Sequence, residues 1–148
     1  MGLDMYLYRK SWVKTGHYYL DEHREEIKIT RGGKDVDTSK IRYIIEEACY
    51  WRKANAIHRW FVDNVQKGVD DCGEYRVNEE TLRDLLNICK EILDDHDKAY
   101  KLLPTQEGFF FGSTAYDEYY FSDIQHTYDA LLNVLEDDAS EYTYHSSW

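Results

Sequence analysis

The chain has 148 residues, the usual size of one domain, and this length can bury a core without disulfide or metal support. Hydrophobic residues make up 43% of the sequence and proline occurs once, which argues against a disordered chain and against a proline-rich linker. The formal net charge of −11 argues against binding to nucleic acids or anionic membrane surfaces, because such binding is driven by Lys and Arg.

The first half of the chain predicts three strands. Residues 3–8 alternate between apolar and polar side chains, as a strand with one buried face does, and a polar loop follows over residues 14–24. Residues 25–31 lead into an Arg-Gly-Gly-Lys sequence, which indicates a strand that enters a turn. The β-branched and aromatic residues within 41–51 favour a third strand, which continues into the segment YWRKANAIHRWFVDNVQ.

The second half is predicted to be mainly helical. Asn78 is a suitable N-cap for a helix whose apolar residues recur at helical spacing as far as Leu93, with Cys89 in the core stripe. A short helical turn is expected before Pro104, and a long helix over residues 120–135.

Two shorter segments predict further strands. The glycine-bounded apolar run at residues 108–112 indicates a buried strand, and the tail at 142–148 alternates like a final strand. No repeat, low-complexity tract or domain boundary is visible. The sequence therefore predicts a single α+β domain over residues 1–148, with a small, mostly antiparallel sheet packed against three or four helices.

The cysteines indicate a reducing compartment. The chain has three cysteines, Cys49, Cys72 and Cys89, which lie far apart in the sequence. No two of them form a C-x-x-C pair, so neither a zinc ribbon nor a thioredoxin-type site is expected. The sequence has no apolar run long enough to span a membrane and no signal peptide. We therefore expect a cytoplasmic protein with no metal and no cofactor.

The segment 50–66 is the best candidate for a functional site, because it gathers cations and tryptophans in an acidic chain. As a helix from residue 52 to 66, it has an apolar stripe that faces the core: Ala54, Ile57, Phe61 and Val65. The solvent side carries Arg52, Arg59, Asp63 and Gln66. His58 and Asn64 fall on the borders of the stripe, where partly buried polar groups need hydrogen-bonding partners.

This segment predicts a binding site for a small anion. The candidate ligand-binding residues are Trp51, Arg52, Lys53, Asn55, His58, Arg59, Trp60 and Asn64. The tryptophans can stack a planar ring, the cations can meet phosphate groups, and the helix N-terminus favours an anion. The alternative is structural: the tryptophans pack in the core, and His58 and Asn64 bond to neighbouring loops. The sequence leaves both open.

No other motif names a reaction. The acidic run at residues 70–74 could bind a divalent cation, but it lacks EF-hand spacing and a nearby histidine, so a solvated turn is favoured. Gly112-Ser113 lacks the second glycine of a nucleophile elbow, and Gly32-Gly33-Lys34 is too short for a phosphate-binding loop. We therefore assign no catalytic residue. The sequence supports no particular enzymatic activity but leaves one open, and a non-enzymatic role is favoured.

Four blocks of this sequence are similar to segments of a known protein family. They are the start MGLDMYLYRK, the block YWRKANAIHRWFVDNVQKGVDDCGEY, the segment LLPTQEGFFFGSTAYDEYYF and the ending SSW. With these blocks the chain resembles, over most of its length, a family of small, uncharacterised proteins of tailed bacteriophages and prophages, and the resemblance is specific in the blocks. The resemblance implies an accessory phage protein made in the cytoplasm of an infected bacterium, and it supplies no activity or site residues. Small phage accessory proteins often counter host defence.

Three functions from different classes follow. The first is non-enzymatic binding of a small anionic, nucleotide-like host molecule, such as a defence signal, in a protein that can be a homo-oligomer. The second is an acidic inhibitor or nucleic-acid mimic that docks on a basic host protein through the clusters at 94–95, 117–118 and 136–138. The third is a small metal-assisted hydrolase that uses residues 70–74.

Overall fold

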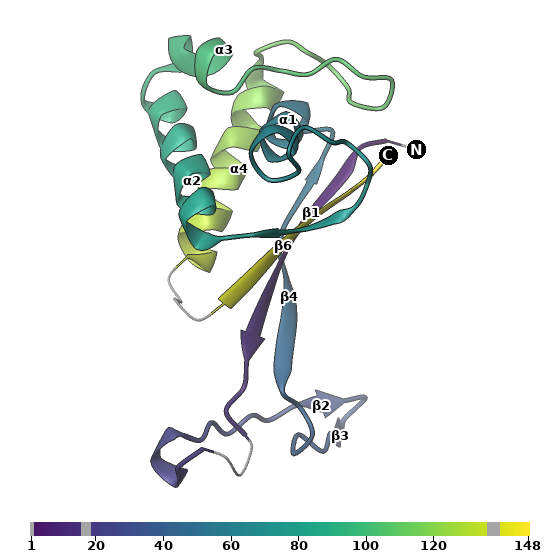
Figure 1. Cartoon of the computed structure of the whole chain (residues 1–148), viewed down its shortest axis with the longest axis vertical. Coiled ribbons are helices and arrows are strands. Elements are labelled where there is room, and N and C mark those ends of the chain that lie inside the picture. Colours follow the sequence, from purple (N-terminus) through teal and green to yellow (C-terminus); the bar gives the residue numbers. More distant parts are fainter. Residues whose placement is uncertain (1, 16–18, 136–139) are drawn as a thin grey trace.

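The computed structural model describes residues 2–15, 19–135 and 140–148, and its centre is a four-stranded sheet (Figure 1). The strands lie in the order β4 (Tyr43–Arg52), β1 (Asp4–Trp12), β6 (Ser140–Ser147) and β5 (Glu74–Val77). All three pairings are antiparallel. The predicted α+β class is confirmed, and so are the strands expected near the start, middle and end of the chain.

Alternation along the strands divides the sheet into an inner and an outer face. Leu7, Cys49 and Tyr144 point to the inner face and are buried. Tyr6 and Tyr8 of β1 point the opposite way, to the outer face, and keep part of their surface exposed. The sheet thus has one face in the core, while its outer face carries tyrosines.

A β-bulge interrupts the pairing of β1 with β4. Leu7 pairs with Cys49 and Tyr8 pairs with Glu47, so Ala48 is an extra residue in β4. A bulge of this kind bends the strand and increases its local twist. Past the bulge β1 and β4 continue as a paired ribbon as far as Trp12 and Tyr43, and β6 flanks β1 as far as Ser11.

Four α-helices of the described chain accompany the sheet: α1 (Asn55–Asn64), α2 (Glu79–Asp94), α3 (Ala99–Leu102) and α4 (Glu118–Val134). The N-cap predicted for α2 is confirmed, because the Asn78 side chain accepts a hydrogen bond from the Thr81 N–H at 2.7 Å. Asp117 caps α4 in the same way, since it accepts from the N–H groups of Tyr119 and Tyr120, each at 3.1 Å.

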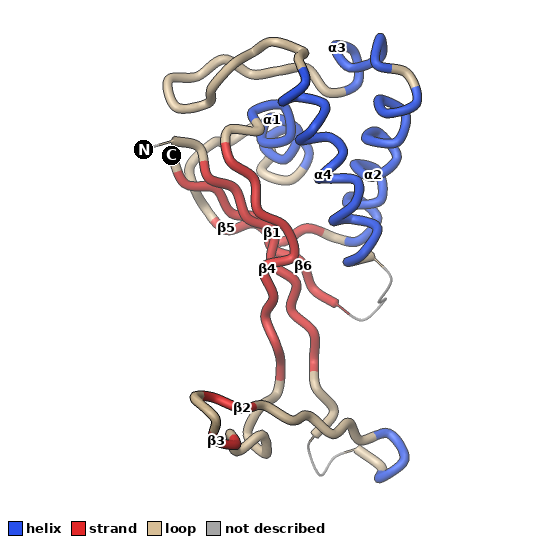
Figure 2. Tube along the Cα trace, turned by 180° about the vertical axis from the view of Figure 1, so that it is seen from behind, coloured by secondary structure: helices blue, strands red, loops and turns tan. Residues whose placement is uncertain are grey.

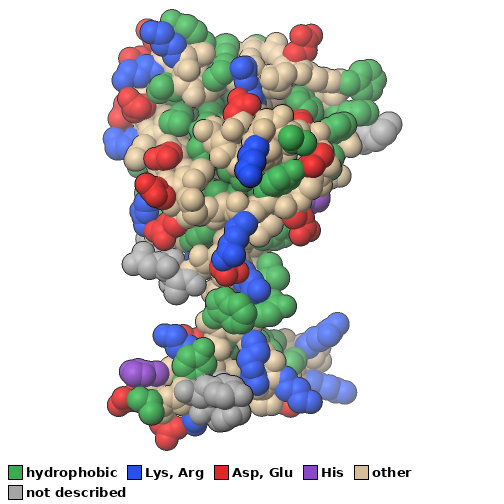
Figure 3. Space-filling model, viewed as in Figure 1, with side chains coloured by type: hydrophobic (Ala, Val, Ile, Leu, Met, Phe, Trp, Pro, Cys, Tyr) green, Lys and Arg blue, Asp and Glu red, His purple; other side chains and the backbone are tan. Residues whose placement is uncertain are grey.

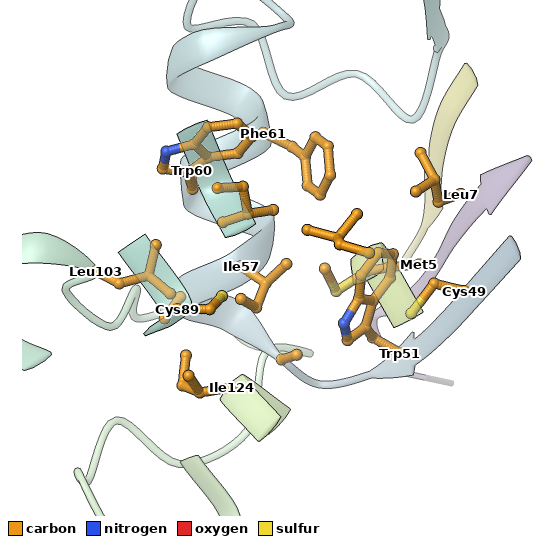
Figure 4. Packing of buried hydrophobic residues seen from close by; sticks show 14 of the residues in the cluster. Met5, Leu7, Cys49, Trp51, Ile57, Trp60, Phe61, Cys89, Leu103 and Ile124 are labelled. Carbon is orange, nitrogen blue, oxygen red and sulfur yellow. The ribbon is translucent and has the colours of Figure 1, made fainter. Parts of the chain in front are cut away.

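The core lies between the inner face and the helices (Figure 4). Phe61 of α1 stacks on Tyr144 of β6 with ring centroids 3.9 Å apart. Leu7 and Ile124 contribute to the same cluster from β1 and α4. Cys89 of α2 is fully buried, as predicted, and burial raises the pKa of its thiol to about 12. It therefore acts as an apolar packing residue.

The described residues of the segment 13–42, which are 13–15 and 19–42, form an arm that projects from the ends of β1 and β4 (Figure 2). Its base continues the ribbon: the Val13 N–H donates to the Arg42 carbonyl oxygen at 2.8 Å, and the Thr15 hydroxyl donates to the Ile41 carbonyl oxygen at 2.8 Å. Among the described residues of the arm only Val13 is buried. The arm therefore has no core of its own.

The far part of the arm contains three short elements. They are the 3₁₀ helix η1 (Asp21–His23) and the strands β2 (Thr30–Arg31) and β3 (Lys34–Asp35), which pair as a hairpin. The hairpin turn holds Gly32 and Gly33 at φ values of 58° and 79°, a conformation that glycine adopts without strain. The turn predicted there is confirmed, but the strand predicted over 25–31 is reduced to Thr30–Arg31.

Two other local predictions were wrong. The helix expected from residue 52 begins at Asn55, because β4 continues through Trp51 to Arg52. Residues 108–112 form a turn, closed by a hydrogen bond of 3.1 Å from the Phe111 N–H to the Gly108 carbonyl oxygen, and Phe109 is 95% exposed. The acidic run at 136–138 and residues 16–18 of the predicted loop lie outside the described residues.

Candidate functional site

A cleft of about 330 Å³ opens at the N-terminal end of α1. Three parts of the chain form its walls: the junction between β4 and α1, the loop over residues 105–115, and the first half of α4. Its polar lining residues are Arg52, Lys53, Asn55, Thr105, Ser113, Asp117, Tyr119, Ser122 and Asp123. The volume lies at the small end of the range found for small-molecule sites.

The junction between β4 and α1 leaves backbone donors at the cleft. The residue at the N-cap of α1 is Ala54, which has no side chain that can accept a hydrogen bond. The N–H groups of Ala56 and Ile57 meet no acceptor within the described part of the chain. Both residues line the cleft, and free N–H groups at a helix start favour a negatively charged group.

Lys53 is held beside these donors in an unusual backbone conformation. Its φ is 56°, in the left-handed region that only a few per cent of non-glycine residues adopt. The Lys53 N–H donates to the Leu3 carbonyl oxygen at 2.7 Å, and its own carbonyl oxygen accepts from the Asn55 N–H at 2.9 Å. Strained residues of this kind persist where the surrounding structure fixes them, often at binding sites.

The Lys53 side chain packs between two glycines. A Cβ atom added to Gly2 would lie 3.2 Å from Cε of Lys53, and one added to Gly112 would lie 3.2 Å from its Cβ. No carboxylate of a described residue lies within ion-pair distance of the Lys53 ammonium. Lys53 is thus a positioned cation whose charge is not neutralised by a neighbouring carboxylate.

Arg52 is a weaker candidate because it already has a partner. Its guanidinium lies 3.2 Å from a carboxylate oxygen of Asp4, which also accepts a hydrogen bond from the Tyr50 hydroxyl. The arginine side chain is about half exposed. It adds positive potential at the mouth of the cleft, but much of its charge is balanced by Asp4.

The opposite wall of the cleft supplies an aromatic ring and hydroxyl groups. Tyr119, in the first turn of α4, is 73% exposed. Ser122 follows on the same helix, and Ser113 comes from the loop, where its hydroxyl oxygen accepts from the Ala115 N–H at 3.1 Å. An exposed tyrosine ring can stack on a planar group, and the serine hydroxyls can donate hydrogen bonds.

Asp123 is the half-buried carboxylate of the cleft. Burial raises its pKa to about 6, the negative charge of Asp117 adds to the increase, and His126 opposes it. At a pH of about 6, Asp123 is therefore protonated in about half of the protein molecules. A carboxyl group with a raised pKa in a cleft is a frequent mark of a functional site.

The two tryptophans predicted to stack a ligand are instead part of the core (Figure 4). Trp51 is 2% exposed and Trp60 is 8% exposed, and both pack edge-to-face against Phe61. The Trp51 Nε1–H donates to the Thr127 hydroxyl at 2.8 Å. This correction follows from the strand position of Trp51: alternation in β4 points it to the inner face, together with Cys49.

Asn55 lies at the cleft, as predicted, but its side chain forms hydrogen bonds with the loop over residues 105–115 and not with a ligand. Its side-chain amide donates to the carbonyl oxygens of Phe111 at 3.0 Å and Ser113 at 2.8 Å, and its side-chain oxygen accepts from the Gln106 N–H at 2.9 Å. Both donors are therefore used within the protein. Asn55 fixes the loop wall and offers a ligand no free donor.

His58 also has internal partners and does not line this cleft. It is 1% exposed, with Nδ1 2.7 Å from the Tyr144 hydroxyl and Nε2 2.9 Å from a carboxylate oxygen of Asp70. Trp148 donates to the other oxygen of Asp70 at 3.0 Å. These contacts form a chain that ties α1 to β6, so the predicted contact of His58 with a ligand is replaced by a structural role.

The remaining predicted residues lie away from the cleft. Arg59 pairs with Asp63 at 3.7 Å and lines a different hollow, beside residues 106–111. Asn64, at the last turn of α1, donates to the Trp60 carbonyl oxygen at 2.8 Å. Gln66 was expected in solvent but is 1% exposed, because α1 ends at Asn64 and the chain turns inward. The structure therefore brings together Arg52, Lys53 and Asn55 alone of the predicted set.

The acidic residues at 70–74 point to separate partners. Asp70 accepts from His58 and Trp148, while Asp71 accepts from the Tyr75 hydroxyl and the Gly73 N–H. Within the described ranges no three His, Cys, Asp or Glu side chains converge as metal ligands would. The run forms a bend at Asp71 and Cys72 in the connection between α1 and β5, which agrees with the favoured alternative of a connecting turn, and Glu74 is the first residue of β5.

Sequence reasoning missed the residues of the cleft that come from distant segments: Gly112, Ser113, Tyr119, Ser122 and Asp123. The only local signals were the glycine that ends the phenylalanine run and the Asp117 cap, which marks the start of α4. Neither signal shows that this part of the chain lies against residues 52–57. That proximity depends on tertiary packing.

Comparison of the chain with models of protein families, with curated proteins and with solved structures found no match. None of the helices in the described ranges has both the length and the apolar character needed to cross a bilayer. Function is therefore inferred from the cleft itself and from its surroundings.

Proposed function

We propose that the cleft beside α1 binds a small, anionic, nucleotide-like molecule and that the protein sequesters this molecule without converting it. The observation that carries the proposal is Lys53. It is a cation without a carboxylate partner among the described residues, held between two glycines and placed next to the free N–H groups of Ala56 and Ile57. A phosphate group satisfies the lysine and these donors together.

The other lining residues suit the remainder of a nucleotide. Tyr119 offers an exposed ring on which a base can stack, in place of the buried tryptophans. Ser113 and Ser122 offer hydroxyl groups for a sugar or a second phosphate. Asp123 accepts hydrogen bonds from sugar hydroxyls when it is ionised and donates one when it is protonated.

The biological setting of this proposal rests on the resemblance to phage proteins. In the cytoplasm of an infected bacterium, a protein that binds a nucleotide-like defence signal lowers the free concentration of that signal. Such a role needs affinity and abundance, and it needs no catalytic group. The described cleft offers a charged and aromatic binding surface, which suits this role.

The acidic-inhibitor alternative has less support from the described residues. Asp94 forms an ion pair with Lys90 at 2.9 Å, and Asp95 caps the 3₁₀ helix η2 (His96–Lys98) by accepting from the Asp97 N–H. Asp117 caps α4. These three aspartates therefore stabilise local structure, as charged residues on helices usually do.

The direct test is native mass spectrometry of protein purified gently from a bacterial host, followed by denaturation and analysis of the released small molecules. A stoichiometric adduct that contains phosphate supports the proposal and identifies the ligand. Recovery of the same molecule unchanged after incubation with fresh protein separates binding from hydrolysis. A protein that carries no adduct and binds no member of a nucleotide panel in calorimetry overturns the proposal.

A further inference from the structure

The base of the arm carries an exposed apolar patch. Pairing along β1 and β4 places Trp12 opposite Tyr43 and Lys10 opposite Ile45, and alternation puts all four on the outer face. Ile45 is 58% exposed, and Trp12 and Tyr43 are each about half exposed. The Lys10 ammonium lies over both rings, 4.6 Å from Trp12 and 4.1 Å from Tyr43. Figure 3 shows hydrophobic side chains gathered at this narrow part of the molecule.

The patch continues along the outer face of the sheet. Tyr6 and Tyr8 lie parallel with ring centroids 5.9 Å apart, and Tyr6 lies 5.3 Å from Tyr50 on β4. The face therefore presents one aromatic row from the body of the protein to the arm. Contiguous exposed apolar surface of this kind is uncommon on monomeric proteins and marks interaction sites.

The arm itself is poorly supported in a single copy. Of its described residues only Val13 is buried, and its own strands, β2 and β3, form a separate two-stranded hairpin. The pairing of β6 with β1 ends at Ser11, before the arm begins. Two-stranded ribbons are marginally stable in water unless another layer covers them. A partner on the outer face supplies such a layer for the base of the arm.

One segment of the arm is opposite in charge to the body. The arm as a whole is nearly neutral, with seven Lys and Arg against six Asp and Glu, but most of its cations lie within residues 28–42. Residues 28–42 contain five Lys and Arg against two Asp and Glu, whereas the chain outside 13–42 contains 11 Lys and Arg against 23 Asp and Glu. The five cations are Lys28, Arg31, Lys34, Lys40 and Arg42, and none has an ion-pair partner within the described ranges. Figure 3 shows Lys and Arg side chains exposed on the arm. On the outer face of the body, Glu47 and Glu74 flank Tyr8.

We propose that the outer face and the arm form a homodimer interface, in which two copies pack with their arms antiparallel. A two-fold axis near Lys10 and Ile45 lets the aromatic row of one copy meet that of the other. The same operation brings the basic hairpin of each arm, with Lys28, Arg31 and Lys34, onto the acidic body of its partner. The surface is thus complementary to itself in both shape and charge, which a two-fold interface requires.

The test is sedimentation analysis of the full chain from about 1 µM to about 100 µM. We expect twice the monomer mass at the upper end, and weaker dimerisation when NaCl rises from about 50 mM to about 500 mM, because the contacts between arm and body are exposed. Ile45→Arg should weaken dimerisation about tenfold or more. Phe109→Arg, which changes an exposed aromatic residue outside the interface, should leave it unchanged.

A second variant covers the charged contact. The double substitution Arg31→Glu and Lys34→Glu reverses charge on the exposed hairpin of the arm, where no packing is disturbed. It should weaken the dimer at low salt and have little effect at high salt. A chain that stays monomeric at the upper concentration, or a dimer that both Ile45→Arg and the charge reversal leave intact, overturns the proposal.

Discussion

Lys53 and Gly112 are in such close contact that a Cβ atom on the glycine would lie 3.2 Å from the Cβ of the lysine. Gly112 also has a φ of 82°, which disfavours any side chain. Gly112→Ala should therefore destabilise the fold by about 1 kcal/mol and also displace the lysine. We expect weaker binding of AMP, used as a probe and measured by calorimetry.

The matched control for this variant is Gly68→Ala. Gly68 has a φ of 79° and would bring its Cβ within 4 Å of no heavy atom. It carries the same backbone penalty without the contact to Lys53. Equal loss of AMP affinity in the two variants would show that the effect comes from general destabilisation and not from the position of Lys53.

Substitution of Lys53 itself should remove most of the affinity for the phosphate. A hydrogen bond to a charged group is worth about 1.5–3 kcal/mol, so Lys53→Ala should weaken AMP binding about tenfold to a hundredfold. Lys67→Ala is the control, because Lys67 has nearly the same backbone φ, 55° against 56°, and does not line the cleft. If both variants bind AMP as the parent does, the role of Lys53 is refuted.

The carboxyl group of Asp123 predicts a pH dependence of both stability and binding. Its pKa is raised from 3.8 to about 6, so the folded state holds the proton more tightly than the unfolded state. Ionised Asp123 therefore lowers the free energy of unfolding. This loss of stability is absent below pH 3.8, grows between pH 3.8 and about 6, and is complete above that range. Asp123→Asn should therefore stabilise the protein at neutral pH, by about 1 kcal/mol after allowance for solvent screening.

Binding of an anion should follow the same protonation. Loss of the Asp123 charge as the pH falls through about 6 removes a repulsive carboxylate from the cleft, so AMP should bind more tightly at pH 5.5 than at about 7.5. The phosphate titrates near the same pH, so AMP is compared with a sulfonate analogue that stays charged. An Asp123→Asn variant that keeps the full pH dependence with the sulfonate would count against this origin.

The conformation of the loop over residues 105–115, which forms one wall of the cleft, should depend on the hydrogen bonds of Asn55. Asn55→Asp keeps the shape of the side chain but points carboxylate oxygens at the carbonyl oxygens of Phe111 and Ser113, which now receive hydrogen bonds. We expect a loss of about 3 kcal/mol in urea unfolding and faster proteolysis within residues 105–113. Asn55→Ala removes the bonds without the repulsion and should cost less. Equal stability of the two variants would contradict the assigned donors.

Sequence patterns predicted the elements whose signals are local. The Asn78 cap and the stripe through Cys89 place α2 correctly, because a cap and a helical period depend on neighbouring residues. The alternation near the start of the chain does the same for β1. The apolar run at 108–112 misled, since burial cannot be deduced from hydrophobicity alone, and Phe109 is almost fully exposed.

The error at the candidate site has one backbone cause. The sequence places Arg52 and Lys53 near the start of a helix, which is close to the truth, but it cannot show that Lys53 adopts a left-handed conformation and separates strand from helix. That conformation leaves Trp51 on the strand, facing the core. The distant partners of the site, such as Tyr119 and Asp123, become visible only after the chain is folded.

The extra residue in β4 gives the arm its direction. Removal of Ala48 would restore a regular ladder, with Cys49 still facing inward and Glu47 still facing outward, so no side chain would change face. Only the bend and the added twist would be lost. A single inserted residue, Ala48, therefore sets the angle between the body and the arm. A chain without it would keep the cleft but aim its arm elsewhere, and ligand capture could be separated from assembly by deletion of one alanine.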